Sequence, residues 1–156
     1  MRVTRVFTVL AAIALLGVAC GDDTTGIPAG LEVYTAQLNG ANEAPTPVQT
    51  SATGHAVVTI MGDSVLTWEV VIDSPIDSIT QNGGHIHRHH PDSVAGGVVV
   101  PLNPAATGLD FSGTATIGSS TPPDSVFDII RDGRAYVNIH TRANGGGEIR
   151  GTLVRQ

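Results

Sequence analysis

Apolar and polar residues alternate in short runs along most of the chain between Leu31 and Val154, and this period of two is typical of β-strands that bury one face. The clearest example is the pair of runs from Gly54 to Ile60 and from Ser64 to Ile72, which predicts a β-hairpin. Gly62 and Asp63 between the two runs supply the turn. The face of the second run that we expect to be buried carries Leu66, Trp68, Val70 and Ile72.

Further runs of this kind predict the remaining strands, which are Leu31 to Leu38, Ile76 to Thr80, Ala95 to Leu102, Gly108 to Ile117, Arg134 to Thr141 and Gly147 to Val154. Gln81 to Gly84 is expected to bend or bulge just before a group of histidines. The stretch from Asn39 to Thr53 contains prolines, which cannot donate to a strand ladder, so we expect a loop or an edge segment there.

One segment departs from the period of two. After a polar start at residues 121–125, apolar residues follow at helical spacing from Val126 to Ile130, and Gly133 supplies a stop. This pattern predicts a helix of about two turns. Seven or eight short strands with glycine- and proline-bearing turns, together with this single helix, favour an antiparallel β-sandwich or barrel.

Composition limits the kinds of partner. The chain has 156 residues, of which 41% are apolar and only 4% aromatic, so one domain with a core of mainly aliphatic side chains is expected. It contains no lysine, and its formal net charge is −6. An acidic surface repels nucleic acids and anionic lipid headgroups, which disfavours both as partners and leaves cations as natural small ligands.

The N-terminus has the pattern of an export signal. Two arginines precede an apolar run from Val6 to Ala19, which is too short to span a bilayer as an ordinary helix, so residues 1–19 are predicted to be a signal peptide. Residues 16–20, Leu-Gly-Val-Ala-Cys, resemble the lipobox of bacterial lipoproteins, with Cys20 as the lipidated residue. Residues 20–30 would then be a flexible tether and residues 31–156 the folded domain, held at the cell envelope. The alternative is an ordinary signal peptide with an incidental cysteine.

Histidines are concentrated in one stretch, because four of the six lie between Gly83 and His90. On a strand, His85 and His87 would share a face with Cα atoms about 6.6 Å apart, and their rings could converge on one ion. A third ring, that of His140, lies in the run Tyr136 to Thr141. These three histidines are the candidate ligands for copper or zinc. The alternative is a polar face on which the histidines bond to one another and to Asn138 or Thr141.

A second candidate feature is a polar cluster formed by Asn138, Glu148 and Arg150 across the last two predicted strands. Its alternative is an ordinary cross-strand ion pair. The sequence shows no ordered nucleophile triad, phosphate-binding loop or paired catalytic carboxylates, so it predicts no catalytic residues.

Five motifs stand out along the chain: Leu-Asn-Gly-Ala-Asn-Glu-Ala-Pro at residues 38–45, Thr-Gly-His-Ala at 53–56, Gly-His-Ile-His at 84–87, Gly-Arg-Ala-Tyr-Val-Asn-Ile-His-Thr at 133–141 and Gly-Glu-Ile-Arg-Gly-Thr-Leu at 147–153. Together they resemble the chordin-type domain family called CHRD. The resemblance covers nearly all of the chain from Leu31 to Val154. It implies an all-β, Greek-key, immunoglobulin-like sandwich that has been compared with copper/zinc superoxide dismutase. No established enzymatic activity comes with the family.

Two functions remain open from the sequence. The first is an exported, membrane-anchored and non-catalytic interaction module whose protein or glycan partner is unknown. The second is a copper- or zinc-binding protein, either a metal carrier or a dismutase-like enzyme, that uses the three histidines.

Overall fold

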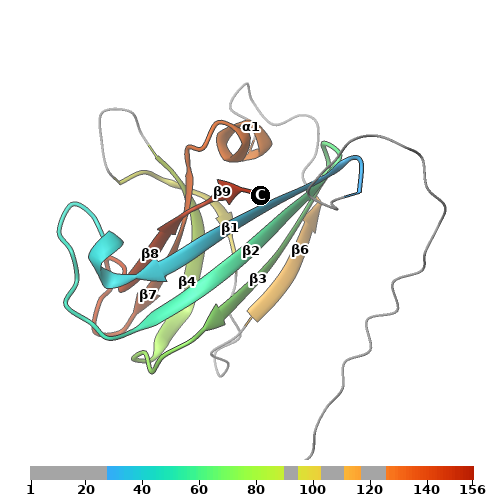
Figure 1. Cartoon of the computed structure of the whole chain (residues 1–156). Helices are drawn as coiled ribbons and strands as arrows, with labels where there is room; N and C mark the ends of the chain where they lie inside the picture. Colours follow the sequence, from blue (N-terminus) through green and yellow to red (C-terminus); the bar gives the residue numbers. More distant parts are fainter. Residues whose placement is uncertain (1–27, 90–94, 103–110, 117–125) are drawn as a thin grey trace, which may run out of the picture.

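The computed structural model describes residues 28–89, 95–102, 111–116 and 126–156 of the chain (Figure 1). The strands are β1 (Leu31–Asn39), β2 (Thr53–Met61), β3 (Val65–Ile72), β4 (Ile79–Arg88), β5 (Val98–Pro101), β6 (Phe111–Thr116), β7 (Ala135–Thr141), β8 (Ile149–Thr152) and β9 (Val154–Arg155). A 3₁₀ turn, η1 (Gly40–Asn42), follows β1, and a helix, α1 (Val126–Arg131), precedes β7. The expected signal peptide, Cys20 and the polar start of the expected helix lie outside the described residues.

The described strands form one antiparallel sheet in the order β5-β4-β7-β8-β1-β2-β3-β6, and β9 pairs with β1. The sheet curls, so that β4, β7 and β8 pass behind β1, β2 and β3 and cross them (Figure 1). β1 and β8 share one register pair, Asn39 with Arg150, which is where the two halves of the sheet meet. The expected all-β class is confirmed, and the two layers are halves of one curled sheet.

The expected hairpin is present as β2 and β3, which pair from Gly54 with Ile72 to Met61 with Val65. Gly62 in the turn has a φ of 59°, a conformation that costs glycine little. The expected buried face of β3 is confirmed, since Leu66 and Val70 are fully buried and Trp68 is 8% exposed.

The core fills the space between the two halves of the sheet. Side chains of β1 and β2, such as Leu38 and Val58, pack in the same apolar cluster as Val137 and Ile139 of β7. α1 adds Phe127 and other side chains to this cluster. The described part of the helix agrees with the prediction, and Gly133 follows it with a φ of 68°, as expected of a helix stop.

Three local features differ from the sequence-based expectations. The last expected strand is two strands, because Leu153 N–H bonds to Ala135 O while Val154 pairs with Thr35 of β1. The strand expected to begin at Ile76 begins at Ile79. The 3₁₀ turn was not expected.

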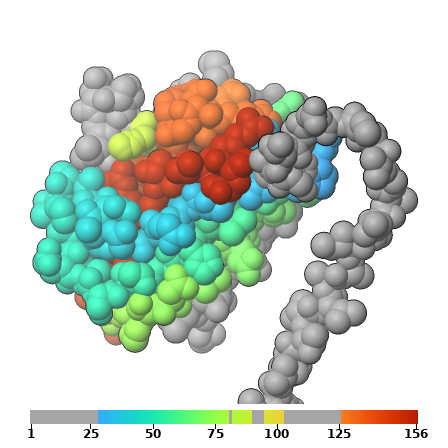
Figure 2. All heavy atoms as spheres, viewed as in Figure 1, coloured from blue at the N-terminus to red at the C-terminus, as the bar shows by residue number. Residues whose placement is uncertain are grey.

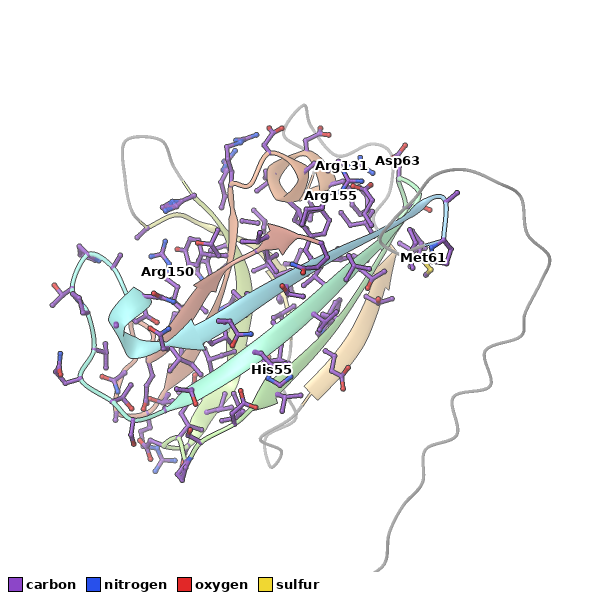
Figure 3. The ribbon with its side chains drawn as sticks, in the orientation of Figure 1. His55, Met61, Asp63, Arg131, Arg150 and Arg155 are labelled. Atoms are coloured by element: carbon purple, nitrogen blue, oxygen red, sulfur yellow. The ribbon has the colours of Figure 1, made fainter. Side chains whose placement is uncertain are left out.

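Arg131 of α1 lies at one end of the sheet, and η1 lies at the other end (Figure 3). Its guanidinium donates to Glu32 Oε1 at 2.6 and 2.9 Å and forms an ion pair with Asp63 Oδ1 at 2.9 Å. The hydrogen bonds from Arg131 are the main reason that the pKa of Glu32 lies below its ordinary value, and burial opposes them. The guanidinium of Arg131 thus links α1 to β1 and to the β2–β3 turn.

Candidate metal centre

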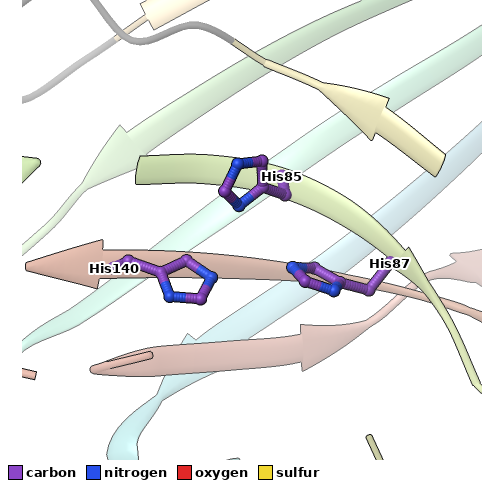
Figure 4. Close-up of side chains that lie close together, drawn as sticks. All are labelled: His85, His87 and His140. Atoms are coloured by element: carbon purple, nitrogen blue, oxygen red, sulfur yellow. The ribbon is translucent and has the colours of Figure 1, made fainter. Parts of the chain in front are cut away.

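The three candidate histidines lie on one face of the sheet. β4 and β7 are neighbours, with His85 opposite Asn138 and His87 opposite Tyr136. Directly paired residues point to the same side of a sheet, and His140 lies two positions beyond Asn138 on β7. The three rings therefore gather outside the core, on the side opposite Ile86, as the alternation predicted (Figure 4).

A bulge in β4 adjusts the backbone beside His140, where a bend was expected. The register between β4 and β7 shifts between Ile79 and Gly84, and Asn82 has a φ of 61°. A Cβ on Gly83 would lie 2.5 Å from the carbonyl oxygen of His140. The glycine is therefore required for the close approach of the two strands at this point.

One ring nitrogen from each histidine lies within 4.8 Å of the corresponding nitrogens of the other two. The ring centroids are 5.3 Å apart for His85 and His87, 5.1 Å for His85 and His140, and 5.7 Å for His87 and His140. The structure thus brings together residues that are 55 positions apart in the chain.

Hydrogen bonds to the backbone fix the tautomers of two of these rings. His87 Nδ1 lies 2.8 Å from Gly96 O, and His140 Nδ1 lies 3.0 Å from Gly145 O. A carbonyl oxygen can only accept, so each Nδ1 carries a proton, and in the neutral form of each ring Nε2 presents a lone pair. These two Nε2 atoms, together with His85 Nδ1, are buried and have no hydrogen-bond partner within the described part of the chain.

The electrostatic environment keeps two of the rings neutral at neutral pH. Burial, and to a smaller extent the neighbouring His140 and His87, lower the pKa of His85 to about 4. Burial also lowers the pKa of His87, and the hydrogen bond to Gly96 offsets part of this effect. Neutral imidazole is the form that binds a metal ion.

The sequence left open a polar face on which the histidines bond to Asn138 or Thr141. Thr141 Oγ1 donates to Glu148 Oε2 at 2.6 Å, and Asn138 Nδ2 donates to Glu43 Oε2 at 3.4 Å. Both side chains therefore direct these donors at carboxylates. No hydrogen bond from either side chain to the histidines is found among the described residues.

The donor set fits copper or zinc. With metal–nitrogen bonds of about 2.0–2.1 Å, the nitrogens of a tetrahedral site stand about 3.4 Å apart, so nitrogens up to 4.8 Å apart need to close by at most about 1.4 Å. Such a shift lies within the range of small side-chain rotations. Among the described residues the group contains these three histidines only, which would leave a fourth position for water or another ligand.

The aromatic ring of Tyr136 packs against the imidazole ring of His87. The two rings are stacked, with centroids 5.0 Å apart and 9° between their planes. The guanidinium carbon of Arg150 lies 3.6 Å from the centroid of the same tyrosine ring. Because β7 lies between β4 and β8, His87 and Arg150 reach Tyr136 from the strands on its two sides.

The expected polar cluster of Asn138, Glu148 and Arg150 is not a single unit. Glu148 accepts hydrogen bonds from Thr50, Thr141 and Asn144, and no ion pair joins it to Arg150 in the described structure. β8 begins at Ile149, so the strand alternation that would place Glu148 beside Arg150 does not apply. Burial raises the pKa of Glu148, but the three hydrogen bonds outweigh it and the net shift is downward.

Sequence reasoning missed Glu43, which is 5% exposed and lies against Asn138. Burial raises its pKa, and the charge of Arg150 and the bond from Asn138 oppose that rise. The only sequence signal for a role of Glu43 was its position in the Asn-Glu pair at residues 42–43. His55 is a half-exposed strand residue that pairs with Asp73 at 3.0 Å, and His90, the last of the four clustered histidines, lies outside the described residues.

Fold and site together define a small antiparallel β-domain with a histidine cluster on one outer face of its sheet. The family model of the CHRD domain matches residues 34–153, so the chain belongs to the CHRD-domain family, as the motifs suggested. The match includes all three histidines. No curated protein and no solved structure matches the chain. Within the described residues, no helix has the length and apolar character needed to cross a membrane.

Proposed function

We propose that this CHRD-domain protein binds a copper or zinc ion through His85, His87 and His140, and that it does so as a non-catalytic binding module. The observation that carries the proposal is the convergence of three buried ring nitrogens that have no hydrogen-bond partner among the described residues. Leaving a buried nitrogen without a partner costs about 1–3 kcal/mol, and a metal ion would satisfy all three at once.

Binding without turnover is favoured over a dismutase. A copper/zinc dismutase requires a bridging histidine and a zinc-binding aspartate beside its copper ligands. The group found among the described residues consists of three histidines and lacks such an acid. The domain would therefore hold or carry the ion.

The test is the metal content of the purified full chain. The protein is stripped with a chelating resin, loaded with Zn(II) or Cu(II), desalted and assayed for metal per chain. The wild type is expected to retain one ion, and His87→Ala and His140→Ala are expected to retain none. His55→Ala is the matched control, because His55 is a histidine on the same sheet that lies outside the cluster. Retention by His87→Ala, or no retention by the wild type, would overturn the proposal.

We also propose that the domain works outside the cytoplasm, attached to a membrane through Cys20. The support is the export pattern of residues 1–19 and the lipobox-like residues 16–20. Intact mass of the mature chain is expected to show acyl chains on Cys20. Cys20→Ser is expected to move the protein from the membrane fraction to the soluble fraction. An unmodified N-terminus beyond Ala19 would contradict the anchor without affecting the metal proposal.

A further inference from the structure

A hollow of about 610 Å³ lies on the outer face of the sheet, beside the junction of β1 with β8 and β9. Its lining includes Arg150, the polar side chains of Thr35, Gln37, Thr152 and Gln156, and the apolar residues Ala44 and Val154. In the space-filling view the C-terminal residues lie directly along those of β1 (Figure 2). The volume falls in the range of pockets that hold small organic ligands, about 300–1,000 Å³.

Arg150 is the unusual member of this lining, because a guanidinium is rarely buried without a counter-charge. The residue is 4% exposed, and no carboxylate of the described residues lies within ion-pair distance of it. Its contacts are the face of Tyr136 and His89 Nε2, the latter at 3.2 Å. His89 accepts that bond, so its ring is neutral there and supplies no counter-charge to Arg150.

Glu43 is the acid whose pKa responds to Arg150. The positive charge of Arg150 lowers that pKa, and burial, the larger effect, raises it overall. No ion pair joins the two side chains among the described residues. By contrast, Arg131 at the other end of the sheet has Glu32 at 2.6 Å and Asp63 at 2.9 Å.

We propose that this hollow binds a small polyhydroxylated carboxylate, such as a sugar acid, with the carboxylate on Arg150. A guanidinium matches a carboxylate through paired N–H bonds, and amide and hydroxyl side chains are the usual partners of sugar hydroxyls. The amides are those of Gln37 and Gln156, and the hydroxyls those of Thr35 and Thr152. A single negative charge suits the site better than a phosphate dianion, because the chain is acidic overall.

The pocket is separate from the three histidines. Tyr136 stands between them, since His87 contacts its ring from β4 and Arg150 contacts it from β8. Carboxylate binding must therefore persist in protein that holds no metal, which distinguishes this inference from the proposed metal function.

The experiment is calorimetric titration of the resin-stripped full chain with sodium galacturonate, galactose and inorganic phosphate. Galacturonate is expected to bind, and galactose and phosphate to bind at least tenfold more weakly. Equal binding of galactose, preferential binding of phosphate, or no binding of galacturonate would each overturn the proposal.

Variants localise the site. Arg150→Lys keeps the charge but removes the paired donors, and it is expected to weaken galacturonate binding at least tenfold. Because Arg150 is buried, Gln37→Glu provides a second variant on an exposed side chain, and its added charge is expected to weaken binding about tenfold. Met61→Glu adds the same charge at the far end of the sheet and should leave affinity unchanged (Figure 3). Equal losses in Gln37→Glu and Met61→Glu would exclude this pocket.

Discussion

The phenol ring of Tyr136 lies parallel to the imidazole of His87, with 9° between the planes and 5.0 Å between the centroids. The tyrosine hydroxyl accepts the N–H of Gly96 at 3.2 Å, and the carbonyl of Gly96 accepts from His87 Nδ1 at 2.8 Å. The three residues thus form a closed ring of contacts. It fixes both the plane of His87 and the tautomer that directs Nε2 toward His85 and His140.

The first prediction concerns the aromatic ring of Tyr136. Tyr136→Leu removes the stacking surface under His87, and metal affinity is expected to fall about tenfold, the lower end of the effect of removing a group that orients a metal ligand. Tyr136→Phe keeps the ring and should change affinity by less than about threefold. Competition with a chromogenic chelator measures both, on protein shown to be folded by circular dichroism. Equal losses in the two variants would mean that the hydroxyl, and not the stacking, positions His87.

The second prediction concerns Gly96, whose carbonyl holds His87. A Cβ on Gly96 would collide with the carbonyl oxygen of Arg88, so Gly96→Ala must displace the backbone that accepts from His87 Nδ1. Metal affinity is expected to fall at least tenfold, measured by the same competition assay. Gly97→Ala is the matched control, because a Cβ there meets no described atom within 4 Å. If both variants bind metal like the wild type, the carbonyl of Gly96 does not orient the ligand.

The parts of the fold that were predictable are those that depend on neighbouring residues. The β2–β3 hairpin and the buried face with Leu66 follow from alternation and turn chemistry within one short segment. The shared face of His85 and His87 follows in the same way from their spacing. His140 could be placed with His85 and His87 once β7 was assumed to lie beside β4.

The contacts that orient the site were not predictable, because they leave no side-chain pattern. The groups that fix His87 and His140 are the backbone carbonyls of Gly96 and Gly145, and any residue type offers a carbonyl. Glu43 reaches Asn138 across 95 positions of chain. The last segment forms two strands because β8 pairs with β7 and β9 pairs with β1. Pairing between strands distant in sequence leaves no local pattern.

The third prediction concerns Gly147, which lies between Glu43 and Asn138. Its φ is 125°, and a Cβ would come within 2.5 Å of both amide atoms of Asn138 and 2.7 Å of Glu43 Oε1. Gly147→Ala is therefore expected to lower the free energy of unfolding by about 2–4 kcal/mol, from steric overlap and from a backbone conformation that alanine adopts poorly. Gly146→Ala, where a Cβ meets no described atom within 4 Å, should change it by less than about 1 kcal/mol. Urea denaturation of both variants measures the difference, and similar midpoints would contradict the packing argument.

The fourth prediction concerns the pH dependence of the ion pair between Glu32 and Arg131. The pKa of Glu32 is lowered in the folded protein, chiefly by the hydrogen bonds from Arg131. The unfolded chain therefore binds a proton more readily than the folded chain below the ordinary glutamate pKa of 4.5. The stabilisation from Glu32 is fully present above that pH and is lost as the pH falls through the lowered pKa of the folded state.

Glu32→Gln should accordingly destabilise the protein by about 1 kcal/mol at pH 7, because the partner guanidinium loses a charge-assisted hydrogen bond at a partly exposed position. The difference between wild type and variant should shrink as the pH is lowered from 5 to 3, followed by urea denaturation at each pH. Glu69→Gln removes a carboxylate from an exposed position of β3 and serves as the control, with no comparable loss at pH 7. A difference between wild type and Glu32→Gln that stays constant over this range would show that the side chain acts through packing and not through its charge.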